Sequence, residues 1–132
     1  MNTIKHKIQS QSLLKIKKII EEDKNGDKFI IIRTKKNRDF MMENGLNDED
    51  VKNIIKELSV QDCFSGPEPD RDSKYKGYIF KFYPIFNEIK LYIKIRIESS
   101  EKSICLSIHE FGKYDSKGEQ KWKYIVHIVI KK

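Results

Sequence analysis

Residues 88–98 read EIKLYIKIRIE and alternate between apolar and polar side chains without a break. A period of two is typical of a β-strand, because successive side chains of a strand point to opposite faces of a sheet. The segment therefore predicts an antiparallel strand with one face in a core and the other in water. The side chains expected to point inward are Ile89, Leu91, Ile93, Ile95 and Ile97, and those expected to point outward are Lys90, Tyr92, Lys94 and Arg96.

Neighbouring segments predict further strands of the same sheet. The aromatic run YIFKFY at 78–83 precedes the alternating segment, and SICLSIHE at 103–110 follows it after a polar turn. We expect another short strand in KFIIIRT at 28–34 and a last apolar strand in WKYIVHIVIKK at 122–132. Within 103–110 the alternation places Ile104, Leu106 and Ile108 inward, and Ser103, Cys105, Ser107 and His109 outward.

The N-terminal segments have helical rather than strand periodicity. Residues 9–22 carry apolar side chains at helical spacing. Residues 47–58 do the same, after an N-cap at Asn47 or Asp48 and an acidic first turn. A shorter helix is expected within 37–45. This order of elements predicts an α+β fold in which N-terminal helices pack on the apolar face of an antiparallel sheet, within a single domain over residues 1–132.

Charge and composition narrow the classes of partner. The formal net charge of +7 indicates attraction to a polyanion, which can be nucleic acid, an anionic membrane or an acidic protein. The chain has no apolar run of the roughly 18 residues that a membrane helix needs, and no apolar N-terminal signal segment. We therefore expect a cytoplasmic protein with no membrane partner.

Cysteine and histidine usage gives no indication of a metal or cofactor. In a cytoplasmic protein, Cys63 and Cys105 are expected to be small buried hydrophobic residues rather than a disulfide. His6, His109 and His127 lie far apart in the sequence and lack the spacing of a zinc site. The sequence also contains no phosphate-binding glycine loop. No metal or cofactor is expected.

The outward side chains of the sheet are of the types that metal-free RNA cleavage requires. Facing residues on neighbouring strands lie about 5 Å apart and diagonal ones about 7–8 Å, so that Tyr92, His109 and one or two cations can converge on one phosphate. One group takes the 2′-hydroxyl proton, another protonates the leaving oxygen, and cations stabilise the developing charge. The candidate cations are Lys81, Lys94 and Arg96. An ordinary solvated sheet face carries similar residues, so the pattern alone leaves both readings open.

Residues 65–77 form a long connection between the helices and the sheet, and they begin with SGPEPDRD. An ordinary connection needs only about 4–6 residues. The two prolines stiffen this backbone and bias the residues before them toward extended conformations. We expect a stiff loop at the rim of the polar face rather than a spacer, with acids that select a base or only solvate the loop. The residues concerned are Gly66, Pro67, Glu68, Pro69, Asp70 and Arg71.

Several motifs taken in order resemble one known family. LSVQDCFSGPEPDRD, YIFKF, IKLYIKIRI and ICLSIHE together resemble the MqsR family of toxins from bacterial toxin–antitoxin systems, in particular the branch with a GPEPD-type loop. The similarity covers residues 12–111 and leaves 112–132 as a C-terminal extension. The resemblance implies a RelE-like α+β fold and an endoribonuclease that cleaves mRNA without a metal or the ribosome. It also implies neutralisation by a cognate antitoxin protein.

The resemblance assigns roles residue by residue. Tyr92 in LYIK matches a tyrosine of the family's active surface, and Lys94 follows the family's Tyr-x-Lys pattern. Lys81 falls near a family glutamine. His109 stands where the best-studied branch has a catalytic lysine, and a histidine can act as general acid or base in its place. Ser65 departs from the family, which has a functional lysine there. The cations that can replace this lysine are Arg71, Lys74 and Lys76.

These observations predict a toxin-type endoribonuclease for single-stranded mRNA. The expected catalytic residues are Tyr92, His109 and Lys81, and the expected phosphate-binding residues are Lys94, Arg96 and the loop cations. Two alternatives stay open. One is a nucleic-acid-binding module on the same fold that has lost cleavage, which the departure at Ser65 favours. The other is a basic protein that docks on an acidic protein partner and inhibits it.

Overall fold

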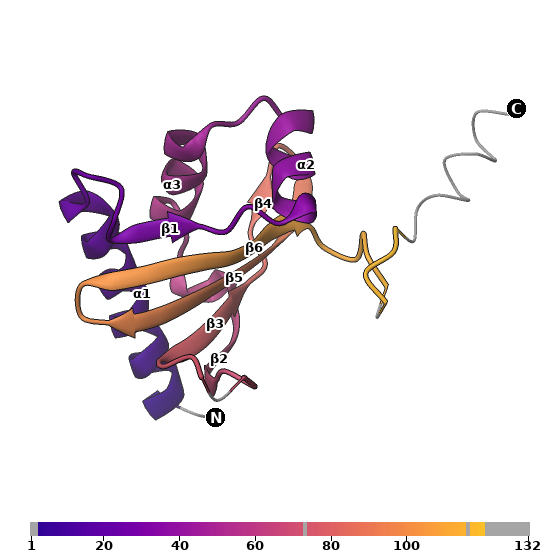
Figure 1. Cartoon of the computed structure of the whole chain (residues 1–132). Helices are drawn as coiled ribbons and strands as arrows, with labels where there is room; N and C mark the ends of the chain where they lie inside the picture. The colour runs from indigo at the N-terminus through magenta and orange to yellow at the C-terminus, as the bar shows by residue number, and fades with distance from the viewer. Residues whose placement is uncertain (1–2, 73, 116, 121–132) are drawn as a thin grey trace, which may run out of the picture.

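The computed structural model describes residues 3–72, 74–115 and 117–120. Within these residues, three α-helices and a six-stranded sheet form an α+β fold, as the sequence predicts (Figure 1). The helices are α1 (Thr3–Glu22), α2 (Lys35–Glu43) and α3 (Asp48–Lys56), and a short 3-10 helix, η1, spans Val60–Asp62. The strands are β1 (Phe29–Ile31), β2 (Cys63–Pro69), β3 (Tyr78–Phe82), β4 (Ile85–Phe86), β5 (Ile89–Ser99) and β6 (Lys102–Glu110).

The strand order is β1-β6-β5-β3-β2, so the alternating segment β5 is the central strand. It pairs antiparallel with β6 on one side and with β3 and β4 on the other, and β2 pairs antiparallel with β3 at the edge. The sheet is mixed rather than purely antiparallel, because β1 runs parallel to β6 with Phe29 opposite Ser103. The apolar composition of three residues indicates that β1 is buried, but it does not indicate the direction of the strand.

The helix termini follow from local capping. At the start of α3, the Asn47 side chain accepts a hydrogen bond from the backbone N–H of Asp50, and the Asp50 carboxylate accepts one from the N–H of Asn47. This reciprocal capping box satisfies two N–H groups that have no partner inside the helix. Thr34 caps α2 in a similar position, so α2 starts before residue 37. α1 begins at Thr3, well before residue 9, since residues 3–8 contain neither glycine nor proline.

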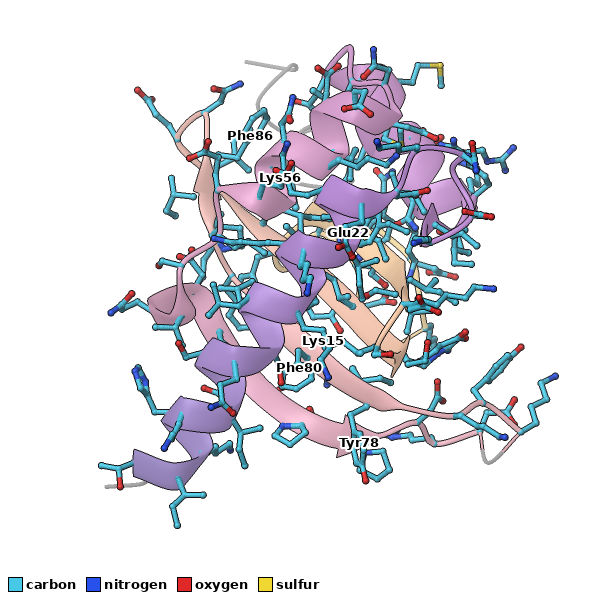
Figure 2. The ribbon with its side chains drawn as sticks, turned by 90° about the vertical axis from the view of Figure 1, so that its left-hand side faces the viewer. Lys15, Glu22, Lys56, Tyr78, Phe80 and Phe86 are labelled. Atoms are coloured by element: carbon cyan, nitrogen blue, oxygen red, sulfur yellow. The ribbon has the colours of Figure 1, made fainter. Side chains whose placement is uncertain are left out.

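The helices cover one face of the sheet and form the core with it. α1 runs across this face, with Lys15 close to Phe80 of β3 (Figure 2). An ion pair of 3.2 Å between Lys56 and Glu21 joins α3 to α1. Deeply buried members of the core include Ile16 and Ile19 of α1, Val51 and Ile55 of α3, Leu91, Ile93 and Ile95 of β5, and Ile108 of β6.

A β-bulge at Leu106 changes which side chains of β6 face the core. Ser107 lies opposite Lys94, but Cys105 rather than Leu106 lies opposite Ile95. The extra residue shifts the alternation by one position. Cys105 is therefore a core residue, and Ile104 lies opposite Arg96 on the other face. The prediction that Ile104 points inward and Cys105 outward is wrong for this reason.

Asn37 of α2 holds the bulge in place. Its Nδ2 donates to the carbonyl oxygens of Ile32 at 2.8 Å and Leu106 at 3.1 Å, and its Oδ1 accepts from the N–H of Ile108 at 2.9 Å. The side chain is 1% exposed. A bulge leaves backbone groups outside the regular ladder, and buried backbone groups need partners. One amide therefore connects α2, the end of β1 and the bulge.

The segment expected to be a loop is partly a strand. Residues 63–69 form edge strand β2, with Ser65 opposite Lys81 and Glu68 opposite Ile79. Proline is tolerated at a sheet edge, where a missing N–H costs no ladder hydrogen bond, and the register shifts on both sides of Ser65 absorb the irregularity. The connection between β2 and β3 is therefore 70–77, shorter than predicted, and its described residues, 70–72 and 74–77, belong to no strand.

Gly66 lets β2 approach the sheet closely. Its φ of 124° lies in the region that favours glycine, and a Cβ at this position would lie 2.6 Å from Cδ1 of Phe80. The Gly66 carbonyl accepts a 2.8 Å hydrogen bond from the side chain of Gln9, which is 9% exposed. α1 therefore fixes the position of the strand that leads into the loop.

The chain beyond β6 turns back on itself. Tyr114 and Gln120 form an isolated antiparallel bridge. The strand predicted at 122–132 lies outside the described residues. Among the residues that are described, no helix has the length and apolar character that a bilayer crossing needs.

Candidate functional site

The sheet face opposite the helices collects most of the predicted site residues. We call it the outer face and define it by Lys81 of β3, Tyr92 and Lys94 of β5, and Ser107 and His109 of β6. Lys81 lies opposite Lys94, which lies opposite Ser107, while Tyr92 lies opposite His109. The two rows are two residues apart along β5, which is about 7 Å. Because the bulge comes before Ser107, it leaves this predicted pairing intact.

An aromatic row crosses the outer face. Ring centroids are 4.5 Å apart for Phe64–Tyr83, 5.9 Å for Tyr83–Tyr92, 5.3 Å for Tyr92–His109 and 4.9 Å for His109–Tyr114. Phe111 joins the row beside Tyr83 at 4.6 Å. The rings come from β2, the end of β3, β5, β6 and the segment after β6. Phe64 is 65% exposed and Phe111 is 42% exposed, so the row offers open ring surface.

Lysines lie over this aromatic row. The ammonium group of Lys90 is 4.5 Å from the Phe111 ring centroid and 5.4 Å from that of Tyr83. Lys36 of α2 lies 4.6 Å from the Tyr114 ring. Such cation–π contacts place positive charge beside flat aromatic surface. The other rings of the row, which are Phe64, Tyr83, Phe111 and Tyr114, were not predicted from the sequence. The available signal was the presence of aromatic residues within or next to the strand segments.

The hydrogen bonding of His109 defines its protonation. Nδ1 lies 3.0 Å from the carbonyl oxygen of Glu110. A carbonyl oxygen only accepts, so Nδ1 carries the hydrogen, and the lone pair of the neutral ring is on Nε2. Burial lowers the pKa of His109, and the nearby cations Lys36 and Lys113 lower it further against the opposing effect of Glu110. At neutral pH the ring is therefore an uncharged base.

Lys94 is suited to donate a proton, whereas His109 is suited to accept one. Burial lowers the pKa of its ammonium group, and the adjacent Lys81 lowers it further. An ammonium group with a lowered pKa gives up its proton more readily than an exposed lysine does. Tyr92 differs, because burial, Tyr83 and Glu68 all raise the pKa of its phenol. Tyr92 therefore stays protonated at neutral pH and acts as a hydrogen-bond donor and ring, not as a base.

The GPEPDRD segment borders a cavity beside these lysines. The cavity has a volume of about 270 Å³ and is lined by Glu68, Pro69, Asp70, Arg71, Ile79, Lys81 and Lys94. Ser65 donates to the Glu68 carboxylate at 2.8 Å, which lowers the pKa of Glu68, and Lys81 lies 3.8 Å from the same carboxylate. Glu68, Pro69, Asp70 and Arg71 therefore lie beside Lys81 and Lys94.

The guanidinium group of Arg96 is held by two carboxylates and an aromatic ring. Its side chain is 5% exposed, and its two terminal nitrogens each lie 2.9 Å from a carboxylate, one of Asp70 and one of Glu98. The ring of Tyr75 covers the guanidinium at 4.5 Å. Arg96 therefore anchors the start of the 70–77 loop and is not displayed toward a phosphate. The carboxylate of Asp70 accepts a hydrogen bond from Arg96 and so has the same structural role.

The remaining residues predicted at the rim of the polar face lie away from Tyr92 and His109. Lys74 pairs with Asp72 at 3.8 Å, and Lys74 and Lys76 are exposed and do not line the outer-face cavity. Pro67 lines a different cavity of about 220 Å³ next to α1, together with Lys15 and Phe80 (Figure 2). Gly66 serves the close packing of β2 described above. These four residues are therefore not gathered with Tyr92 and His109.

Cysteine chemistry has no place in this site. Burial raises the pKa of the Cys63 thiol to about 11 and that of Cys105 to about 12, so both remain protonated. Among the described residues, no group of three or more His, Cys, Asp or Glu side chains is arranged to hold a metal ion.

Comparison of the chain with protein-family models, curated proteins and solved structures gives no match.

Proposed function

We propose that the outer face binds single-stranded RNA and cleaves it by acid–base catalysis without a metal. The observation that carries the proposal is the neutral His109 imidazole with its lone pair on Nε2, placed opposite Tyr92 and one row from Lys94 and Lys81. These side chains supply a base, a hydrogen-bond donor, a proton donor and a cation on one surface. The resemblance to MqsR toxins adds mRNA as substrate, inhibition of translation as consequence, and a cognate antitoxin as partner.

In the proposed reaction, Nε2 of His109 takes the proton of a ribose 2′-hydroxyl. The 2′-oxygen bonds to phosphorus, and the bond between phosphorus and the 5′-oxygen breaks. The Lys94 ammonium group gives a proton to that departing oxygen, while Lys81 stabilises the charge that builds on the phosphoryl oxygens. The products are a 2′,3′-cyclic phosphate and a 5′-hydroxyl. DNA lacks the 2′-hydroxyl and therefore is not a substrate.

The aromatic row provides the binding surface for the strand. Base-on-ring stacking contributes about 1–3 kcal/mol per base and tolerates many sequences. Lys90 and Lys36 add charge beside the rings, which favours a polyanion. Because the exposed rings of this row, Phe64 and Phe111, are separate from His109, the row also supports a second function, which is RNA binding without cleavage. At the position where the MqsR family has a functional lysine, this chain has Ser65, which donates a hydrogen bond to Glu68. The absence of that lysine favours this alternative.

Two substitutions separate cleavage from binding. His109→Gln removes the base and keeps the size of the side chain, so we expect cleavage to fall by at least about 100-fold with little change in RNA affinity. His6→Gln on the exposed surface of α1 is the matched control. Phe64→Ala should weaken RNA binding by about five-fold or more, measured by fluorescence anisotropy, whereas alanine at Tyr78, a similarly exposed aromatic residue beside α1, should not.

The outcomes are distinct. RNA binding with no cleavage by the wild type would leave the binding function and reject the catalytic one. Cleavage that survives His109→Gln would reject the assignment of the base. Absence of RNA binding by the wild type would reject both functions and leave docking on an acidic protein as the next candidate.

A further inference from the structure

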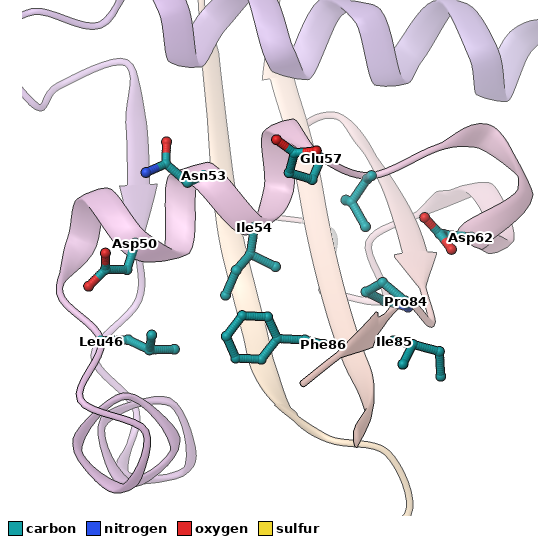
Figure 3. A pocket seen from close by; sticks show the side chains of 10 residues that line it. Leu46, Asp50, Asn53, Ile54, Glu57, Asp62, Pro84, Ile85 and Phe86 are labelled. Atoms are coloured by element: carbon teal, nitrogen blue, oxygen red, sulfur yellow. The ribbon is translucent and has the colours of Figure 1, made fainter. Parts of the chain in front are cut away.

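An apolar groove lies between α3 and β4, and none of the outer-face residues lines it (Figure 3). Its volume is about 580 Å³. Ile54 of α3 and Phe86 of β4 point toward each other across it, and Ile85 is 68% exposed at its edge. The remaining apolar lining comes from Leu46, Leu58 and Pro84. Open apolar surface of this kind is typical of a place where another protein surface packs.

The charged residues that line the groove are all acidic. Asp50, Glu57 and Asp62 lie along it, whereas no lysine or arginine of the described residues does, although the chain has a net charge of +7. Asp50 and Asp62 each use Oδ2 to cap a helix start, which fixes both carboxylates at the rim. A surface that matches this groove has apolar side chains for the floor and cationic side chains for the rim.

The solvent-facing side of α1 has both properties. Its apolar side chains are Ile4, Ile8 and Leu14, which are 74%, 39% and 65% exposed. Residues three, four or seven positions apart share one side of a helix, which places exposed lysines on the same side. Between Thr3 and Ile20 the helix contains no acidic residue. We call this surface the α1 stripe, which consists of Ile4, Lys7, Ile8, Leu14, Lys15 and Lys18.

The α1 stripe faces away from the groove of its own chain. The opposite side of α1 is fixed in the core by Leu13, Ile16 and Ile20. α3 contributes to the same core, so both surfaces point out of one packed body. The two surfaces are of comparable length, since Ile4 to Leu14 spans about 15 Å and the α3 wall from residue 50 to 57 about 10 Å. A second copy can therefore bring a stripe to the groove.

We propose that the α3–β4 groove of one copy of this chain binds the α1 stripe of a second copy. The isoleucine and leucine side chains of the stripe pack on Ile54, Ile85 and Phe86, and its lysines lie against the rim carboxylates. Amphipathic helices bind apolar grooves in this way. The contact joins two different surfaces, so each copy has one groove and one stripe to offer. The inference does not depend on the RNA-cleaving function.

Analytical ultracentrifugation of the full chain tests the proposal. One helix in one groove is a small interface, so we expect a weak association in which the sedimentation coefficient rises with protein concentration. High salt should reduce the rise, because it screens the charges at the rim. Ile85→Glu places a charge in the groove and Leu14→Glu places one in the stripe, and each variant alone should stay monomeric. Met42→Glu, at an equally exposed apolar position of α2, is the matched control and should associate like the wild type.

A mixture of the two variants identifies the surfaces that meet. The Ile85→Glu variant keeps an intact stripe, and the Leu14→Glu variant keeps an intact groove. An equimolar mixture should therefore associate through a single contact, although neither variant associates alone. Far-UV circular dichroism checks that both variants are folded. Glu57→Lys, a change of one exposed side chain on α3, gives an independent measurement and should weaken association of the chain by about ten-fold or more.

The contrary outcomes are specific. A wild type that stays monomeric at every concentration would overturn the proposal, and so would a mixture of folded variants that stays monomeric. Association that survives Ile85→Glu, Leu14→Glu or Glu57→Lys unchanged would also overturn it, because the copies would then meet through other surfaces.

Discussion

Asn37 gives the sharpest test of how the sheet is built. Its amide makes three hydrogen bonds, to Ile32, Leu106 and Ile108, and its side chain is 1% exposed. Asn37→Ala removes all three hydrogen bonds at once and leaves their backbone partners in place. A net contribution of about 1 kcal/mol for each bond, with an added cost for buried backbone groups left without partners, gives a loss of about 3–5 kcal/mol. This is a large part of the ~5–15 kcal/mol typical of a domain.

Urea denaturation followed by far-UV circular dichroism measures this loss. We expect the urea concentration at the midpoint to fall. The slope of the unfolding free energy against urea concentration should stay unchanged, since the variant exposes the same surface on unfolding. Asn53→Ala, an exposed asparagine of α3, should change stability by no more than about 0.5 kcal/mol. A loss below about 1 kcal/mol for Asn37→Ala would refute the reasoning, because the bulge would then persist without its side-chain partner.

Three further predictions follow from the geometry and charges. The pH–rate profile of RNA cleavage should be bell-shaped, with the acid limb below 6.5, where His109 gains a proton, and the alkaline limb below 10.5, where Lys94 loses one. A rate that does not fall as the pH is lowered below 6.5 over the range in which the protein stays folded would contradict the role of His109. Gly66→Ala should lower the unfolding free energy by about 2 kcal/mol or more, and by clearly more than Gly26→Ala, because both have positive φ but only the Gly66 Cβ meets other atoms; equal losses would argue against close packing of β2. Burial raises the pKa of Asp23, but hydrogen bonds from the backbone N–H groups of Phe29, Lys28 and Gly26 outweigh it, so the carboxylate stabilises the fold above its unfolded pKa near 3.8 and this stabilisation is lost as pH falls. Asp23→Asn should therefore be less stable than the wild type at pH 7 by thermal denaturation, with the difference shrinking below pH 4, and a constant difference would contradict this linkage.

The parts of the fold that the sequence predicts are those with local signals. The alternation of 88–98 predicted β5 and its inner face, because a half-buried strand imposes a period of two. The Asn47 cap and acidic first turn predicted α3. The same alternation also predicted that Tyr92 and Lys94 share a face, and with 103–110 it predicted that His109 joins them.

The parts that it does not predict depend on contacts between distant residues. The bulge at Leu106 leaves no trace in the pattern, since Ile104 and Leu106 are both apolar and the partner that stabilises the bulge is Asn37, far away in α2. β2 was obscured by its prolines, which an edge strand tolerates. Arg96 has the position of an outward side chain, and only the structure shows Asp70 and Glu98 around it.

The ends of the RNA fragments test the central claim most directly. A defined single-stranded RNA is incubated with the wild type in EDTA, and the masses of the fragments are measured by mass spectrometry. We predict fragments that end in a 2′,3′-cyclic phosphate and begin with a 5′-hydroxyl, and no cleavage where the nucleotide before the cut carries a 2′-deoxyribose. Intact RNA, or fragments with a 5′-phosphate, would contradict the proposed role of the outer face.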